Sequence, residues 1–188
     1  MAVNGKNKGS SFERKIANLL SARFEPHLGV KNGFRRNPDS GSFFGGSNQQ
    51  RTESYNLDYA VFGDLICPRS FQFSVECKHY KTPPSFQSVI SHKVTQWDLW
   101  IGQAERDAAS SGRRMCLIVK YNNVDEIVFL HEPLPDTRHA KYNEYYVHRL
   151  SDWMGMEDSY FFGSTILTED AGGGNASLPI ETPTGVNT

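Results

Sequence analysis

The stretch that most constrains the fold of this chain runs from Leu57 to Tyr80. It predicts two β-strands joined by a short turn at Pro68-Arg69-Ser70, because apolar runs of strand length flank a Pro-containing break. Side chains in the second strand alternate between two faces. One face carries Phe71, Phe73, Val75 and Cys77, and the other carries Gln72, Ser74, Glu76 and Lys78. Burial of the apolar face therefore places Glu76 and Lys78 side by side on the opposite face.

The first strand of this stretch is almost continuously apolar, as a strand buried on both faces should be, except for Asp64. A buried acid is costly unless it is paired or bound to a metal. Asp64, Glu76 and Lys78 therefore form one candidate constellation, in which two carboxylates suit a divalent cation and an amine lies beside them. The alternative is that Glu76 and Lys78 form only a solvated ion pair.

Length and composition indicate one soluble domain, because 188 residues are enough for a single well-packed core. No stretch approaches the roughly 18 apolar residues of a membrane span, and no secretory signal is evident. The three scattered cysteines are expected to be small core residues in a reducing, cytoplasmic compartment. We divide the chain into a disordered basic arm (1–9), a folded domain (10–168) and a Gly- and Pro-rich flexible tail (169–188).

Periodicity along the chain predicts an α/β fold with a mixed central sheet flanked by helices. A strand, a helix and a further strand from residue 71 to residue 119 predict two parallel neighbours in that sheet. The predicted helices cover Ser10 or Ser11 to Phe24, residues 87–109 and a short segment near Ser151; the predicted strands besides those above cover residues 30–35, 115–119, 126–130 and 144–150.

Glu13 lies at the edge of the apolar stripe of the first helix, so its side chain can face the sheet. Ser10-x-x-Glu13 also matches a capping box, in which the glutamate only bonds back to the cap amide. Spacing alone favours the cap and leaves both interpretations open.

Positive charge is concentrated at the start of the chain. Residues 1–40 carry eight Lys or Arg against three acids, whereas the whole chain has a net charge of −1. This asymmetry indicates a basic face, or else a solvated helix preceded by a basic arm. A long polar loop up to Asn56 follows, and its Phe43-Phe44 pair either stacks on bases or covers the edge of the core.

The order of these elements and residues resembles the PD-(D/E)XK nuclease superfamily. The matching residues are Glu13 on the first helix, Gly63-Asp64, and Glu76-Cys77-Lys78. The opening Gly-Ser-Ser-Phe-Glu-Arg-Lys at residues 9–15 is also similar to the start of archaeal-type and phage-type Holliday-junction resolvases. The resemblance covers roughly residues 9–121, and it departs from the superfamily pattern in having Gly63 where the name-giving Pro often stands.

The resemblance implies a restriction-endonuclease-like core and a set of site residues. Asp64 and Glu76 would ligate Mg²⁺ or Mn²⁺ with the backbone carbonyl of Cys77, and Glu13 would be a direct or water-mediated third acid. Lys78 would orient the attacking water or help to deprotonate it. Such a site supplies what phosphodiester hydrolysis requires, an activated water and stabilisation of the charge that develops on the phosphate.

The candidate DNA-binding residues lie on either side of this constellation. Arg35 and Arg36 are expected to contact phosphates, to which a guanidinium gives paired hydrogen bonds, and Lys81 is grouped with them. In the resolvases a serine before the Asp strand assists, and Ser40 or Ser42 is its candidate counterpart here.

We therefore expect a Mg²⁺-dependent endodeoxyribonuclease, and most closely a Holliday-junction resolvase that acts on DNA four-way junctions as a homodimer, because such enzymes cut two strands symmetrically. Three alternatives stay open. They are a restriction-like or nicking nuclease on ordinary duplex, a DNA-binding module that kept the fold and lost catalysis, and a structural protein without DNA binding.

Overall fold

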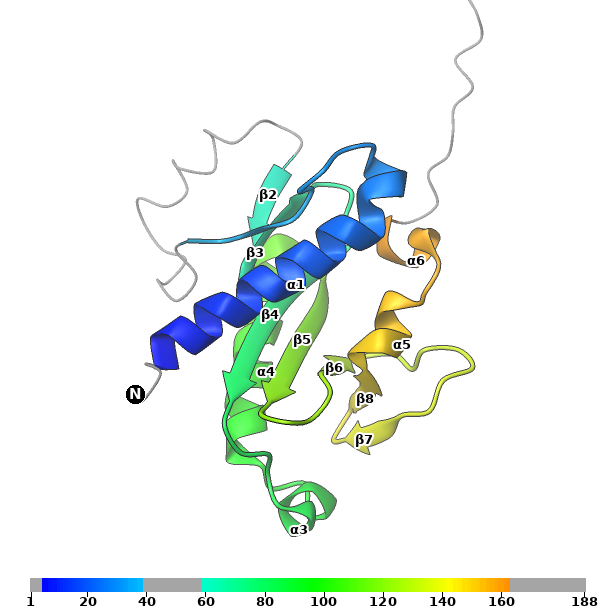
Figure 1. Cartoon of the computed structure of the whole chain (residues 1–188). Coiled ribbons are helices and arrows are strands. Elements are labelled where there is room, and N and C mark those ends of the chain that lie inside the picture. The colour runs from blue at the N-terminus through cyan, green and yellow to red at the C-terminus, as the bar shows by residue number, and fades with distance from the viewer. Residues whose placement is uncertain (1–4, 39–58, 163–188) are drawn as a thin grey trace, which may run out of the picture.

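The computed structural model describes residues 5–38 and 59–162 of the chain. In chain order, its elements are α1 (Gly5–Leu28), β1 (Arg35–Arg36), β2 (Tyr59–Phe62), β3 (Leu65–Pro68), β4 (Phe73–Tyr80), α3 (Phe86–Ile90), α4 (Thr95–Ser111), β5 (Arg114–Tyr121), β6 (Ile127–Leu130), β7 (Ala140–Tyr142), β8 (Tyr145–Arg149), α5 (Leu150–Met154) and α6 (Asp158–Phe162). The long helices α1 and α4 cover opposite faces of the pair β4 and β5 (Figure 1). This arrangement confirms the expected mixed sheet flanked by helices.

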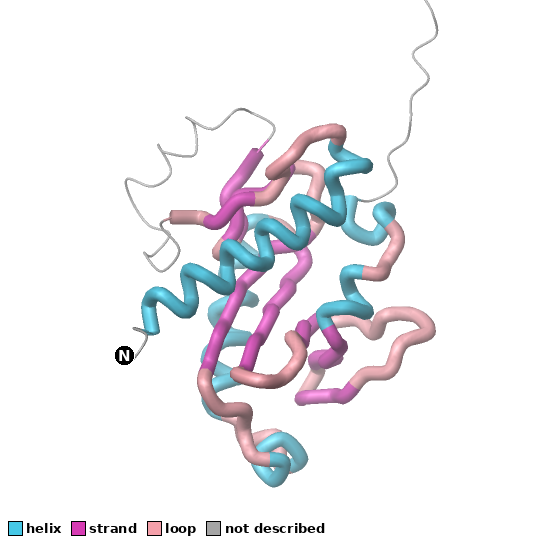
Figure 2. The backbone as a smooth tube through the Cα atoms, in the orientation of Figure 1, coloured by secondary structure: helices cyan, strands magenta, loops and turns pink. Residues whose placement is uncertain are grey.

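The strands of the described residues form two sheets. The larger has five strands in the order β4-β5-β6-β8-β7, in which β4 and β5 are parallel and the other neighbours are antiparallel. The smaller is antiparallel, in the order β1-β3-β2. A parallel bridge between Gly63 and Val75 links the smaller sheet to the outer edge of β4 (Figure 2). The parallel pairing of β4 with β5 confirms the strand–helix–strand prediction.

Each face of the larger sheet has its own apolar cluster. Phe73, Val75 and Cys77 of β4 lie in the cluster formed with α1, α5 and α6. The other cluster packs Trp97 and Ile101 of α4 against β5. The predicted alternation of β4 is thus confirmed for its apolar side chains. The three cysteines are free and buried, as expected of small core residues.

The segment before β4 differs from its prediction, because residues 59–68 form a hairpin (β2 and β3) and not a single strand. The hairpin reverses at Gly63-Asp64, where Gly63 has φ +67°. A Cβ atom on Gly63 would lie 2.5 Å from the carbonyl oxygen of Val75. Only glycine fits both conditions, and a proline, fixed near φ −65°, could not take this position. β3 and β4 consequently lie in different sheets and do not form the predicted hairpin.

The helices also differ from their predicted bounds. α1 begins at Gly5, so residues 5–9 are helical and do not belong to a disordered arm. No proline interrupts this segment, and extending a formed helix adds one hydrogen bond per residue. Ser10 therefore lies inside α1, and the capping-box interpretation of Glu13 is wrong. The predicted helix over residues 87–109 is divided into α3 and α4 around His92, which has φ 51°.

Three further points concern the extent of the elements. The strand predicted over residues 30–35 is reduced to β1, and β7 was not predicted, because Ala140–Tyr142 is too short and polar to show alternation. The proposed tail, and residues 163–168 of the proposed domain, lie outside the described residues. In the described ranges no helix is long and apolar enough to cross a membrane.

Candidate active site

The structure brings Asp64 to the outer edge of β4, beside Glu76 and Lys78. Asp64 is held there by its backbone, whose N–H donates to the carbonyl of Val75 at 2.9 Å. Its side chain accepts a hydrogen bond from the backbone N–H of Cys77, with 2.8 Å between Cys77 N and Asp64 Oδ2. The tight turn at Gly63 makes this approach feasible, so the smaller sheet positions an acid against the strand that carries the other two residues.

Asn37 fixes the turn from the other side. Its backbone N–H donates to the carbonyl of Asp64 at 2.8 Å, and its side-chain amide donates to the carbonyl of Gly63 at 3.3 Å. Sequence reasoning missed this residue, because a single Asn after the Arg35-Arg36 pair gives no signal of a contact with a turn 26 residues further on.

Both carboxylates are withdrawn from water. Asp64 exposes 6% and Glu76 1% of its surface. One oxygen of Glu76 accepts a hydrogen bond from the Lys78 ammonium, which also donates to Gln103 Oε1 of α4 at 3.0 Å. The other oxygen, Glu76 Oε2, is buried without a hydrogen-bond partner. An unsatisfied buried carboxylate oxygen is unfavourable, and a bound cation would remove that penalty.

Burial governs the protonation of the two acids. It raises the pKa of Asp64 to about 6. The hydrogen bond from the Cys77 N–H lowers this pKa, and the charge of Glu13 raises it further. Burial raises the pKa of Glu76 to about 8, with a further contribution from the charge of Asp64. Burial alone would lower the pKa of Lys78, but the carboxylate of Glu76 outweighs it and the net pKa is raised. Lys78 is therefore a cation at neutral pH, while two neighbouring acids oppose each other's ionisation.

The donor set at this position fits a hard divalent cation. Asp64 and Glu76 offer carboxylate oxygens, one of them without a partner, and oxygen ligands are those that Mg²⁺ and Mn²⁺ prefer. Among residues 5–38 and 59–162, no group of three or more His, Cys, Asp or Glu side chains is arranged to hold a metal ion. The two carboxylates are the side-chain ligands that the described geometry offers.

Glu13 lies close to this pair but is engaged elsewhere. It is mid-helix in α1, exposes 8% of its surface, and accepts a hydrogen bond from Arg36 Nε at 2.5 Å. Its charge nevertheless contributes to the raised pKa of Asp64. The structure thus joins two predicted residues, Glu13 and Arg36, into an ion pair beside the site, and a ligand role for Glu13 stays a prediction.

A basic pocket of about 390 Å³ opens next to this ion pair. It is lined by Arg14, Ala17, Asn18, Lys31, Asn32, Phe34, Arg35 and Arg36. Four of these residues are cationic and none is acidic, so the pocket favours anionic groups such as phosphates. The pocket therefore gathers the two predicted arginines with two basic residues, Arg14 and Lys31, that had been counted only in the overall charge.

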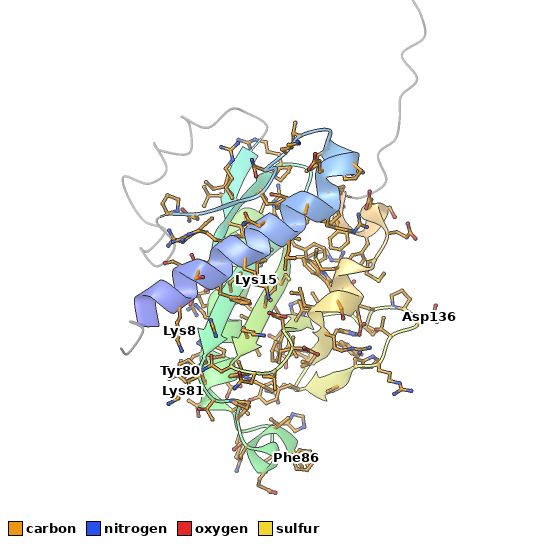
Figure 3. The ribbon with its side chains drawn as sticks, in the orientation of Figure 1. Lys8, Lys15, Tyr80, Lys81, Phe86 and Asp136 are labelled. Carbon is orange, nitrogen blue, oxygen red and sulfur yellow. The ribbon has the colours of Figure 1, made fainter. Side chains whose placement is uncertain are left out.

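Lys81 is not among the residues that line the pocket. Lys81 is exposed, one residue beyond the end of β4 and next to Tyr80 (Figure 3). Ser40 and Ser42, and the Phe43-Phe44 pair, lie outside the described residues.

Helix α4 supplies two polar residues that sequence reasoning did not select. Gln103 contacts Lys78, and the charge of Asp107 adds to the raised pKa of both Asp64 and Glu76. They are four positions apart, which places them on one side of the helix. That spacing was visible in the sequence, but nothing there indicated that this side faces the polar side chains of β4.

The chain is similar to one protein family and to one solved structure. A family model described as "Phage putative PDDEXK endonuclease" matches residues 4–158. No curated protein matches the chain. Among solved structures, the chain is similar to Hjc of Archaeoglobus fulgidus, a Holliday junction resolvase from an archaeal hyperthermophile, with a TM-score of 0.35 and 15% sequence identity over 77% of this chain and 91% of that one.

Proposed function

Because the chain belongs to the phage PDDEXK endonuclease family, we propose that it is a divalent-metal-dependent endonuclease that hydrolyses phosphodiester bonds in DNA. Membership confirms the resemblance to the PD-(D/E)XK nuclease superfamily and supports nuclease activity. The roles of Asp64, Glu76 and Lys78 are part of the proposal. The observation that carries the proposal is the buried Asp64–Glu76 pair, in which Glu76 Oε2 has no hydrogen-bond partner and the Lys78 ammonium lies alongside.

The residues of the site would divide the chemistry between them. Mg²⁺ or Mn²⁺ held by Asp64, Glu76 and the carbonyl of Cys77 would activate a water and offset charge on the phosphate. Lys78 would place its ammonium against the phosphate and orient the water. The carboxylate of Glu76 raises the pKa of Lys78, which favours the charged ammonium beside the phosphate.

The basic pocket gives the substrate a path to these residues. On the α1 side of the site, DNA phosphates would be held by the four basic residues of the pocket, Arg14, Lys31, Arg35 and Arg36. Beyond the end of β4, Lys81 would contact the DNA backbone. Contacts of this kind are independent of base sequence and depend on salt concentration.

Within this class we propose a Holliday-junction resolvase that acts as a homodimer. Support comes from the resolvase-like segment at residues 9–15 and from the lack of a separate specificity domain within the described ranges. Two coupled nicks of opposite strands require two sites related by symmetry, which a two-fold dimer provides.

Cleavage of a labelled synthetic four-way junction in Mg²⁺ tests the proposal, beside a linear duplex of the same sequence and a Glu76→Ala control. Paired symmetric nicks in the junction alone, absent with the variant, are expected. Equal cutting of both substrates would indicate a general or nicking nuclease. Tight binding without metal-dependent cutting would indicate a DNA-binding module that has lost its chemistry.

A thermal unfolding series tests the metal site without DNA. A ligand present at 100 times its Kd stabilises the folded state by about 2.7 kcal/mol. We expect Mn²⁺ or Mg²⁺ to raise the unfolding temperature of the wild type and not that of Glu76→Ala. An equal rise in both proteins would place cation binding elsewhere.

A further inference from the structure

Helix α3 is an exposed apolar projection. None of its five residues is buried, and Phe86 and Ile90, four positions apart, expose 80% and 56% of their surfaces. α3 projects beyond the end of the sheet, where Val89 packs against the cluster of α4 and β5 and Phe86 lies on the outer side (Figures 1 and 3). Phe86 and Ile90 together form an exposed apolar pair on one projection, and it is such patches that mark interaction sites.

The helix is capped at its start and anchored to the fold after its end. Ser85 caps the helix, its hydroxyl accepting the backbone N–H of Ser88 at 3.1 Å. After the helix, His92 Nδ1 accepts the backbone N–H of Asn143 at 3.0 Å, and its ring stacks on Tyr142 with 5.7 Å between the centroids. Phe86 is therefore presented on a fixed support, which lowers the entropy cost of binding.

The segment that carries α3 has a net positive charge, which favours an anionic partner. Residues 79–97 contain no Asp or Glu, and Lys81 and Lys93 lie on either side of the helix in sequence. Both lysines are exposed. Asp98, which follows this segment, accepts a hydrogen bond from the Tyr142 hydroxyl at 2.8 Å. Phe86 follows Lys78 by eight residues, so the projection is joined directly to the strand that carries the candidate active site. A partner that combines negative charge with flat apolar faces, and that reaches the active site, is a DNA strand with unstacked bases.

We propose that α3 is a wedge that places Phe86 against an unstacked base at the branch point of the DNA, with Lys81 and Lys93 on the adjacent phosphates. The inference rests on the proposed nuclease function and adds the element that selects branched DNA. Apolar side chains are known to insert at unstacked base steps, and unstacking is least costly where pairing is already interrupted. The wedge therefore favours a junction over an intact duplex.

Binding measurements separate this role from cleavage. We would compare Phe86→Ala with Leu99→Ala, a matched control because Leu99 is an apolar residue of α4 that exposes 65% of its surface. Both would be made in the Glu76→Ala background, with a four-way junction carrying 2-aminopurine at the branch point and with a linear duplex. Phe86→Ala is expected to weaken junction binding about tenfold, the size of one lost stacking contact, and to change duplex binding less than twofold. When the parent protein binds, unstacking of the base at the branch point should change the 2-aminopurine fluorescence. Phe86→Ala should abolish this change, whereas Leu99→Ala should behave as the parent protein.

Three results would overturn the wedge. The first is unchanged junction affinity in Phe86→Ala, and the second is an equal loss of affinity for junction and duplex. The third is dissociation of a dimer by Phe86→Ala in sedimentation velocity, which would make α3 a protein interface. Because the assay needs no cleavage, a protein that shows the Phe86 effect but cuts nothing keeps the wedge and loses the proposed nuclease function. A protein that cuts junctions but shows no Phe86 effect keeps the proposed nuclease function and loses the wedge.

Discussion

Glu13 lies in the interior of α1, and its carboxylate pairs with Arg36 at 2.5 Å while its charge raises the pKa of Asp64. We predict that Glu13→Gln lowers the cleavage rate at saturating Mg²⁺ about 10- to 100-fold, the range seen when residues that support metal ligands are removed. The helix should keep its stability, because Glu13 does not cap it.

Glu25→Gln is the matched control for Glu13, since Glu25 lies on the same helix away from the site. It should cleave at the wild-type rate. If both variants cleave alike, Glu13 has no part in the site, and the ion pair with Arg36 is only structural.

Gln103 holds the Lys78 ammonium from the α4 side at 3.0 Å. Hydrogen bonds to charged groups contribute about 1.5–3 kcal/mol, so Gln103→Ala should lower kcat about tenfold or more. KM should change little, because the contact positions Lys78 and does not bind DNA.

Measurements of kcat and KM distinguish a Gln103 that positions Lys78 from a Gln103 that contacts DNA. Gln103→Glu keeps an acceptor for the ammonium and should restore part of the rate, and Gln96→Ala on the same helix serves as control. A raised KM with unchanged kcat would instead make Gln103 a DNA contact.

At the scale of the elements, the Gly63 turn decides where Asp64 lies. Gly63 and Gly112 have similar φ values of +67° and +64°, but a Cβ atom at Gly112 would meet nothing within 4 Å. Gly112→Ala should therefore lower the free energy of unfolding only by the cost of a left-handed backbone conformation, about 1–2 kcal/mol. Gly63→Ala should cost at least about 1 kcal/mol more, because the added carbon clashes with the Val75 carbonyl. Equal losses in denaturant unfolding would show that the turn moves aside freely.

Sequence patterns predicted those elements that have a clear period or a clear stop. The alternation of residues 71–78 identified β4, and the helix predicted over residues 87–109 ends close to the observed end of α4 at Ser111. The β2–β3 hairpin was missed because Gly63-Asp64 lies inside an apolar run that has the length of one strand. The break at His92 was missed because the left-handed conformation of that residue depends on its contacts with Tyr142 and Asn143, which are distant in sequence.

The site was predicted in part for the same reason. The proximity of Glu76 and Lys78 follows from strand periodicity. Asp64 stood out only as an acid in an apolar run, and its position at the turn of the β2–β3 hairpin was not predicted. The contacts of Asn37 and Gln103 arise from tertiary packing, which no local pattern encodes.

Low pH should reduce the folding stability of the domain through protonation of His148. This β8 side chain exposes 2% of its surface, and its ring accepts the backbone N–H of Leu134 at 3.3 Å and contacts the Thr137 hydroxyl at 3.1 Å. Burial lowers the pKa of His148 below 6.5, and the neighbouring His139 adds to this, while Asp152 opposes it. Between the two pKa values the unfolded chain binds more protons than the folded chain, so stability falls as the pH decreases below about 6.5.

Urea unfolding at pH 7.5, 6.5 and 5.5 measures this dependence. His148→Gln keeps an acceptor for Leu134 and cannot titrate, so its stability should change less over the same range. A slope identical to that of the wild type would assign the acid sensitivity to other groups.

Asp64, a ligand in the proposed site, also helps to hold the fold together through its hydrogen bond from the Cys77 amide. Within the described part of the chain, the Lys78 ammonium bonds to the side chains of Glu76 and Gln103. Substitutions that abolish cleavage should therefore differ in their effect on the fold at the two positions. A descendant that changes Asp64 also loosens the turn against β4, and a descendant that changes Lys78 keeps its architecture. Lineages of this chain that give up cleavage but keep DNA binding should thus lose the lysine first and carry the aspartate for longer.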